Sequence, residues 1–450
     1  SISLSLINSF ISSYTSNSEE LGNVYSKNDK DVISIWILSG TTGNRDQSTV
    51  LKTLIDQSFT PKTGVKVNVK LISQDSLLSA VVAGNGPDVV LGLASSLPIE
   101  YAIRNANENL LQFPDCEQVL SQFYPSAYLR YQFDGGLYAL PETETFSLLF
   151  YRKDLLEQIG LEIPETWDEL VSMLPTLQDN KLEVGIPYPT IQAPSAGIFY
   201  TQLYQNGGTV YNNNGSRCLI DNEEGVKAFK DYTSLYVNYG LAPEFDFATR
   251  FRQGLMVLGI QDYTVYNTLA VSAPEIRGLW DFVPIPGTLK TRSDGTTYID
   301  RTVNADGVNC MMIKAKNETK KQNAWKFMKW WVSAETQYTY GREMESILGA
   351  SGRYATANKI ALKQLAWSSK QLKVLEDSLE NSFAIPEVPG SYFTSRHVTN
   401  AIRKVYNDKD EPREVIIDYT RKINEELTRK REEFGFETYE DQLKKNGGSK

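Results

Sequence analysis

A continuous run of β-branched and aromatic residues at positions 32–38, VISIWIL, restricts the possible folds of this chain more than any other segment. The run lacks polar alternation, which is typical of a strand that helices bury on both faces. A polar loop at residues 39–44, a predicted helix at 47–59 and a second predicted strand at 65–71 follow it. This strand–helix–strand order predicts an α/β fold with a mostly parallel sheet, in which ligands bind at the carboxyl ends of the strands.

The length of the chain predicts more than one folded unit. At 450 residues it exceeds what one ordinary hydrophobic core holds, so two lobes or domains are expected. Hydrophobic residues make up 41% and charged residues 22%, a balance typical of a folded globular protein. No run of about 18 apolar residues occurs, so no membrane span is predicted. The net charge of −9 argues against a nucleic-acid partner, because phosphate binding requires concentrated lysine and arginine.

Cysteine and histidine are scarce in this chain. Cys116, Cys218 and Cys310 lie about a hundred residues apart without C-x-x-C spacing, which excludes a cysteine-based zinc site and a disulfide scaffold. Three buried thiols are favoured, and one disulfide with a spare thiol is the alternative. His397 is the only histidine, so His-based triads and His-rich metal sites are excluded. The sequence therefore predicts neither a metal nor a cofactor.

The stretch from residue 134 to residue 170 contains several residues that begin or end helices and strands. A Gly-Gly turn leads into an apolar run that Pro141 ends, and polar residues 142–145 separate this run from a predicted strand at 146–151. A helix is predicted from Lys153. Thr166 is predicted to cap a second helix, with Glu169 at the reciprocal capping position.

The order of these segments resembles the extracellular solute-binding proteins of bacterial ABC importers, the broad sugar-binding family that includes maltose-binding protein. The motifs that carry the resemblance are G-x-x-Y-x-x-P before residue 142, Tyr-x-Lys-Asp-Leu-Leu from Tyr151, and Pro-x-Thr-Trp-Asp-Glu-Leu from Pro164. The segments at 251–263 and 321–332 are also similar to family motifs. The resemblance extends from about residue 32 to about residue 436.

The resemblance implies a two-lobed periplasmic-binding-protein-like fold. Each lobe would contain a mostly parallel sheet flanked by helices, with hinge crossings and a ligand cleft between the lobes. The expected division is residues 32–144 with 262–330 in lobe 1, and residues 145–261 with 331–436 in lobe 2. Residues 1–31 are expected to form an N-terminal helix and linker, and residues 437–450 a C-terminal tail.

The resemblance also implies a function. The chain would capture a carbohydrate, with an oligosaccharide favoured, and deliver it to the transmembrane subunits of an ABC permease. It would act as a monomer and not as an enzyme. An extracellular or periplasmic location is implied, with tethering as a lipoprotein or through an upstream segment.

The candidate ligand-binding residues are polar or aromatic side chains that follow predicted strands or lie beside predicted crossings. They are Ser39, Thr41, Asp75, Ser95, Glu144, Thr145, Tyr188, Asp262, Tyr263, Asp306 and Arg353. Glu144 and Tyr263 are the strongest candidates because they lie beside the crossings. Tyr263 stands where family members commonly have tryptophan, and Arg353 lies in a loop that lacks the usual proline.

Two other functions remain open at this stage. A glycan-binding sensory or cell-surface capture module of a larger protein would explain residues 1–31, which resemble no part of either lobe. A glycosidase would use two carboxylates among Glu142, Glu144 and Asp262, but no motif distinguishes a pair. The sequence leaves the ligand's identity and length open, including whether it is a sugar.

Overall fold

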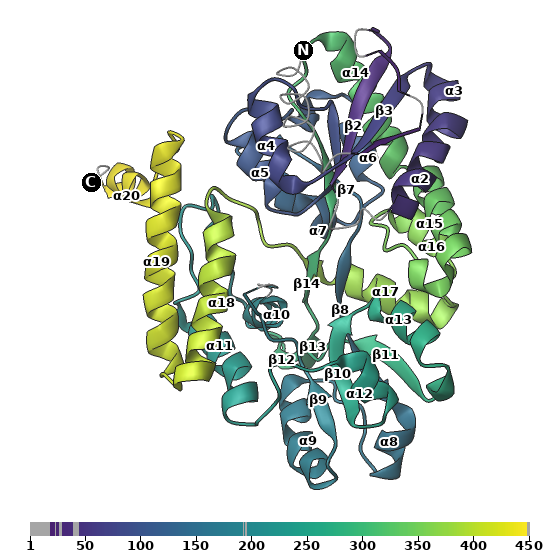
Figure 1. Ribbon diagram of the computed structural model, residues 1–450. Helices are drawn as coiled ribbons and strands as arrows, with labels where there is room; N and C mark the ends of the chain where they lie inside the picture. Colours follow the sequence, from purple (N-terminus) through teal and green to yellow (C-terminus); the bar gives the residue numbers. More distant parts are fainter. Residues whose placement is uncertain are drawn as a thin grey trace, which may run out of the picture. The chain divides into compact units, whose positions relative to one another are not determined.

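The computed structural model of this protein describes residues 19–22, 24–26, 29–38, 45–191, 193 and 196–447 (Figure 1). The chain divides into two compact units. Unit 1 contains the chain up to Glu144 together with Gly307–Leu365, and unit 2 contains Thr145–Asp306 together with the chain from Ala366 onward. The chain therefore crosses between the units three times. No helix in the described residues is long and apolar enough to span a membrane.

Unit 1 is built on a six-stranded sheet whose central strands are parallel. In spatial order its strands are β1 (Glu19–Leu21), β3 (Lys66–Ile72), β2 (Val32–Leu38), β4 (Val89–Leu93), β15 (Asn309–Met312) and β7 (Leu140–Pro141). Strand β2 lies between its parallel partners β3 and β4, whereas β1, β15 and β7 are antiparallel to their neighbours. The predicted strand–helix–strand unit is confirmed.

Helices cover the sheet of unit 1, as Figure 1 shows for α2, α14 and α15. The α-helices of this unit are α2 (Arg45–Leu54), α3 (Thr60–Thr63), α4 (Gln74–Val82), α5 (Leu97–Ala102), α6 (Cys116–Leu120), α7 (Pro125–Tyr128), α14 (Glu318–Val332), α15 (Ala334–Leu348) and α16 (Lys359–Gln364). Aromatic rings on α14 fill the core, where Trp325 stacks on Phe113 at 4.5 Å between ring centres and Phe327 meets Phe59 edge-on. Asn317 caps α14 by accepting from the amide of Lys320, so this helix begins at Glu318, before the segment at 321–332 that is similar to a family motif.

Unit 2 is built around strand β8 (Thr145–Arg152), which begins directly after the first crossing. Its other strands are β16 (Ser382–Phe383), β14 (Val303–Asp306), β10 (Met256–Asp262), β9 (Glu183–Gly185) and β11 (Trp280–Pro284). Strands β10, β11 and β14 all pair with β8 in antiparallel register, whereas β9 and β16 join the sheet in parallel. The predicted α/β fold class is confirmed. The expectation of mostly parallel sheets is wrong, because strands that enter a unit after a crossing, such as β8 and β15, run antiparallel to their neighbours.

The helices of unit 2 surround this sheet and extend into a C-terminal helical group. They are α8 (Lys153–Gln158), α9 (Trp167–Asp179), α10 (Gly197–Gln205), α11 (Glu223–Val237), α12 (Phe247–Arg252), α13 (Val265–Ser272), α17 (Ser369–Glu380), α18 (Ser391–Asp408), α19 (Pro412–Glu433) and α20 (Tyr439–Gly447). In Figure 1, α18 and α19 lie side by side. Strands β12 (Thr288–Thr291) and β13 (Thr297–Asp300) form a separate hairpin.

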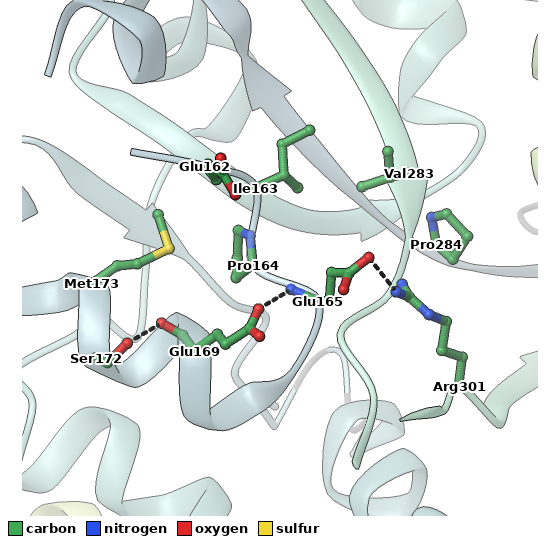
Figure 2. Close-up of a pocket in the computed structure, with 10 residues that line it drawn as sticks. All are labelled: Glu162, Ile163, Pro164, Glu165, Glu169, Ser172, Met173, Val283, Pro284 and Arg301. Carbon is green, nitrogen blue, oxygen red and sulfur yellow. Dashed lines mark hydrogen bonds and ion pairs between the residues drawn. The ribbon is translucent and has the colours of Figure 1, made fainter. Parts of the chain in front are cut away.

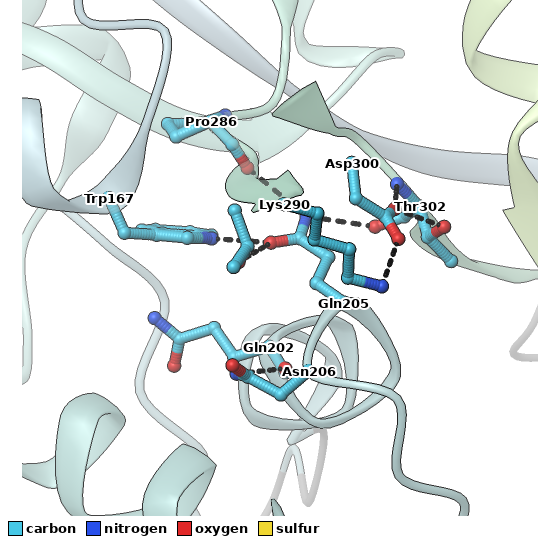
Figure 3. A network of polar contacts seen from close by, with 9 residues as sticks. Trp167, Gln202, Gln205, Asn206, Pro286, Lys290, Asp300 and Thr302 are labelled. Atoms are coloured by element: carbon cyan, nitrogen blue, oxygen red, sulfur yellow. Dashed lines mark hydrogen bonds and ion pairs between the residues drawn. The ribbon is translucent and has the colours of Figure 1, made fainter. Parts of the chain in front are cut away.

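A buried glutamine joins three parts of unit 2 (Figure 3). Gln205, at the end of α10, accepts hydrogen bonds from the indole nitrogen of Trp167 and the hydroxyl of Thr288. Its amide nitrogen donates to the carbonyl oxygens of Pro286 and Thr302, at 3.2 and 3.0 Å. Both ends of the amide are paired, so this fully buried side chain has hydrogen-bond partners at its oxygen and its nitrogen and links α10 to the start of α9 and to the β12–β13 hairpin.

The predicted lobe boundaries agree with the units at one position and differ at two. The break between Glu144 and Thr145 agrees with the division of the structure. Residues 262–306 belong to unit 2 instead of lobe 1, because β10, β11 and β14 all hydrogen-bond to β8. Residues 331–365 belong to unit 1 instead of lobe 2, because α15 packs against α2 and α16.

Three local predictions also need correction. The expected C-terminal tail contains α20, and residues 448–450 lie outside the described residues. The N-terminal segment contributes β1, whereas the helix expected before it lies outside the described residues. Thr166 caps α9 as predicted, but Glu169 bonds back to the amide of Glu165 and not to that of Thr166.

The three cysteines, all within the described part of the chain, are free and buried. This confirms the favoured prediction of three plain buried thiols and excludes the alternative of one disulfide.

Candidate functional site

Three strands of unit 2 bring predicted site residues to the edge of the sheet at which the chain enters and leaves this unit. Strand β8 begins at Thr145, whereas β10 ends at Asp262 and β14 ends at Asp306. Asp306 is paired with Thr145 in the sheet, and Asp262 is paired with Ser147. Thr145 and Asp262 are half-buried, and Asp306 is exposed. Antiparallel pairing therefore gathers two carboxylates and a hydroxyl from segments more than 40 residues apart.

The carboxylate of Asp262 is held by a local turn. Its Oδ1 accepts hydrogen bonds from the backbone nitrogen and the hydroxyl of Thr264, at 2.9 and 2.6 Å. Burial raises the pKa of Asp262, although these hydrogen bonds oppose the shift. A carboxylate fixed in this way is pre-oriented to accept a hydrogen bond from a ligand hydroxyl.

An aromatic cluster lies directly behind this edge. The ring of Tyr263 is only 3% exposed, and its centre lies 5.0 Å from that of Phe146 and 5.9 Å from that of Trp367. Trp367 also contacts Tyr266, with ring centres 5.2 Å apart. Tyr263 was expected to present its ring to a ligand, but in this structure the ring packs within unit 2.

Unit 1 contains a second polar group around the first crossing. The hydroxyl of Ser126 donates to Oε1 of Glu144 at 2.5 Å, and the carboxylate is only 2% exposed. Arg130 donates to Oγ of Ser95 and to the carbonyl oxygen of Ser126, each at 3.4 Å. The hydroxyl of Ser95 in turn donates to the carbonyl oxygen of Gly307, which follows the second crossing. The buried Glu144 and the half-buried Ser95 therefore belong to one hydrogen-bonded network.

Tyr188 lies in a group of tyrosines in unit 2. Its ring meets those of Tyr236 and Tyr406 edge-on, at 5.0 and 5.6 Å between ring centres. The hydroxyls of Tyr232 and Tyr236 donate to the carbonyl oxygen of Pro187, but the buried hydroxyl of Tyr188 has no hydrogen-bond partner among the described residues. Burial raises the pKa of Tyr188 to about 12. An unpaired buried hydroxyl is costly, so it marks a position where a ligand atom would be stabilising.

The remaining predicted residues do not join these groups. Asp75 is exposed in the first turn of α4. Arg353 forms an ion pair with Glu345 at 2.9 Å within unit 1. Ser39 and Thr41 lie outside the described residues.

A hollow on unit 2 is lined by none of the predicted residues (Figure 2). It encloses about 830 Å³ between the segment that precedes α9 and the end of β11. Its polar groups largely pair with one another, because Glu169 accepts from the amide of Glu165, and Glu165 faces Arg301 at 3.5 Å. No group of three acidic, histidine or cysteine side chains suited to a metal ion occurs among the residues that the structure describes.

Comparison with known proteins assigns the family. The sequence model of the family described as bacterial extracellular solute-binding protein matches residues 43–338. The chain belongs to this family.

Solved structures of solute-binding proteins share the fold. An ABC transporter solute-binding protein from Thermotoga lettingae bound with α-D-tagatose has a TM-score of 0.67 and 20% identity, covering 88% of this chain and 100% of the other. A substrate-binding protein of Listeria monocytogenes in complex with cycloalternan has a TM-score of 0.66 and 20% identity, covering 91% of this chain and 100% of the other.

Sequence comparison also finds a relative described as a binding protein in Brucella abortus. It is 21% identical over 377 residues, which are 80% of this chain and 85% of that protein.

Several residues of this solute-binding protein's candidate site escaped the sequence prediction. Ser126 and Arg130 are helical positions with no motif around them, and Trp367 lies beyond the third crossing. One signal was available for Thr264, since an Asp-x-Thr sequence favours the side-chain turn that Asp262 forms. The contacts of Trp367 depend on packing between segments about 100 residues apart, which leaves no local pattern.

Proposed function

We propose that this solute-binding protein is the ligand-capturing component of an ABC import system and that its ligand is a carbohydrate, with an oligosaccharide favoured. The observation that carries the proposal is the edge of unit 2 where Thr145, Asp262 and Asp306 meet. Carboxylates accept hydrogen bonds from vicinal sugar hydroxyls, and half-buried ones bind more strongly than exposed ones. The sugars bound by the T. lettingae and L. monocytogenes proteins support the same ligand class.

Capture would couple ligand binding to hinge motion at the three crossings. A ligand that contacts side chains of both units favours the closed state by its differential affinity for that state. The closed protein would then deliver the ligand to the transmembrane subunits of the permease. The protein acts as a monomer outside the cytoplasm in this proposal, tethered as a lipoprotein or through an upstream segment.

A thermal-shift screen against mono- and oligosaccharides tests the proposal. A ligand at 100 times its Kd stabilises the native state by about 2.7 kcal/mol, which is a readily measured shift. The glycan is recovered afterwards and analysed, because an unchanged glycan indicates capture and a shortened one indicates a glycosidase. An unchanged melting temperature with every sugar of the panel would contradict a carbohydrate ligand.

Asp262→Asn tests the placement of the site once a ligand is found. Loss of a charged acceptor costs about 1.5–3 kcal/mol, so we expect Kd to rise about 10- to 100-fold. The matched control is Asp281→Asn, because Asp281 lies on β11 of the same sheet and pairs with Tyr151, toward the far end of β8. An unchanged Kd for Asp262→Asn, or an equal loss in the control, would contradict the placement.

A further inference from the structure

A buried glutamate that the proposed ligand site does not use lies on the unit 1 side of the crossings. Glu142 is 4% exposed and follows strand β7. Its Oε1 accepts from the backbone nitrogen of Gly92, and its Oε2 accepts from the indole nitrogen of Trp331, both at 2.6 Å. Gly92 can aim its amide this way because it takes a φ of 75°, a left-handed value that glycine adopts without strain.

The backbone of Glu142 joins the segments that lead to all three crossings. Its amide donates to the carbonyl oxygen of Val308 at 2.9 Å, just after the second crossing. Its carbonyl oxygen accepts from the amide of Ala357 at 3.0 Å, on the segment that leads through α16 to the third crossing. Glu142 itself lies two residues before Glu144, where the chain leaves unit 1 for the first time. One residue therefore connects the three exits of the chain from unit 1.

Among the described residues that line the space beside this carboxyl, none carries a cationic side chain. The cavity beside it measures about 30 Å³, and none of its lining residues is lysine, arginine or histidine. This volume holds about one water molecule, whose oxygen can accept a hydrogen bond from the O–H of a neutral carboxyl. The titratable groups that face it are the phenols of Tyr340 and Tyr354 and the thiol of Cys310, and their pKa values are raised by burial and by the nearby carboxyl.

The protonation of Glu142 is shifted by this environment. Burial raises its pKa from 4.5 to about 7, although the hydrogen bonds from Gly92 and Trp331 oppose the shift. The folded state consequently binds more protons than the unfolded chain between these two values. The stabilising contribution of the neutral carboxyl is complete below about pH 4.5 and is lost as the pH rises through about 7.

We propose that Glu142 is a proton-sensitive lock on the unit 1 side of the crossings. The backbone of Glu142 joins the Val308 and Ala357 segments, and its buried carboxyl, held by Gly92 and Trp331, keeps that backbone in place. Ionisation places a charge in this buried site, which is costly, so opening that exposes the carboxylate to water becomes more favourable and the backbone bonds of Glu142 break more often. The lock does not depend on the identity of the ligand.

Hydrogen exchange of the unliganded full chain tests the lock between pH 5 and pH 8.5. Protection factors are corrected for intrinsic exchange and compared for peptides that contain the amides of Glu142, Thr143 and Ala357. We expect protection in these peptides to fall by about tenfold or more as the pH rises, because opening becomes linked to ionisation. A flat profile in the unmodified protein would overturn the proposal.

Three variants identify the responsible group. Glu142→Gln removes the titration, so its profile should be flat; a fall equal to that of the unmodified protein would refute the lock. Trp331→Phe removes one donor to the carboxylate and should move the pH of the protection transition upward. A midpoint at the same pH as in the unmodified protein would also contradict the proposed lock.

Glu108→Gln is the matched control, because Glu108 is likewise buried in unit 1 and accepts from Gln112 and the amide of Ala315. This control should retain the full pH dependence, and its loss would show that the effect is not specific to Glu142.

Discussion

Gln205 accepts a hydrogen bond of 2.8 Å from the indole nitrogen of Trp167 and so joins the end of α10 to the start of α9 (Figure 3). The same amide donates to two carbonyl oxygens, those of Pro286 and Thr302. A side chain that both accepts and donates is needed here, and only an amide of this length provides both functions in that geometry.

Replacement of this amide by a carboxylate should be strongly destabilising. Gln205→Glu keeps the size but removes both donors and buries a charge, so we expect a loss of about 3 kcal/mol in the free energy of unfolding. Gln371→Glu is the control, because Gln371 accepts from the amide of Ser368 at an exposed capping box and glutamate can do the same. Urea unfolding of both variants measures the difference, and equal midpoints would contradict the role of Gln205.

The hydrogen bond between Ser126 and Glu144 should stabilise unit 1. Ser126→Ala removes the donor to a buried carboxylate oxygen, and we expect a loss of about 1–3 kcal/mol in stability. Ser121→Ala, at an exposed serine whose hydroxyl donates to the carbonyl oxygen of Gln118, should change stability by less than about 0.5 kcal/mol. Thermal midpoints of the two unliganded variants check this, and a neutral Ser126→Ala would show that the contact is not energetically important.

Tyr188 and Tyr232 should respond in opposite directions to the loss of their hydroxyls. The hydroxyl of Tyr188 is buried without a partner among the described residues, so Tyr188→Phe should leave the unliganded protein as stable or more stable by about 1 kcal/mol. The hydroxyl of Tyr232 donates to the carbonyl oxygen of Pro187 at 2.6 Å, so Tyr232→Phe should cost about 1 kcal/mol. Calorimetry of both proteins makes the comparison. Equal losses would indicate that the hydroxyl of Tyr188 has a partner after all.

The cysteines should be unreactive while the protein is folded. Burial raises the pKa of Cys116 to about 11 and that of Cys218 to about 12, and Cys310 is also shifted upward by burial. Because the thiolate is the reactive form, a thiol reagent at pH 8 should label none of the three rapidly in the native protein. All three should react after denaturation without a reductant. Rapid labelling before unfolding would contradict the burial of these thiols.

Local sequence patterns predicted most of the elements of this protein. The run at residues 32–38 forms β2, and the helix and strand predicted after it complete a strand–helix–strand motif in which β3 pairs with β2 in parallel. Thr166 caps α9 as predicted, because capping depends on backbone amides only a few positions away. The family resemblance also held, since its motifs are short and contiguous and the family model matches residues 43–338.

The candidate site was predicted less completely. Thr145, Asp262 and Asp306 do meet at one edge, as expected for residues beside strand ends. Whether any of the candidates, these three included, binds the ligand stays a prediction. Tyr263 and Glu144, the two strongest candidates, turned out to be buried. Burial of a polar side chain follows from its partners, here Trp367 and Ser126, and neither partner is identifiable from sequence spacing.

The sequence by itself determined the helices and strands, their order and the family, because hydrophobic periodicity and capping act over a few residues. Only the tertiary structure decided that β10, β11 and β14 all pair with β8, and so that residues 262–306 belong to unit 2. It also decided that Glu142 is buried where three crossing segments meet. Pairing between segments more than 100 residues apart depends on the complementary packing of whole faces, and no local sequence pattern specifies it.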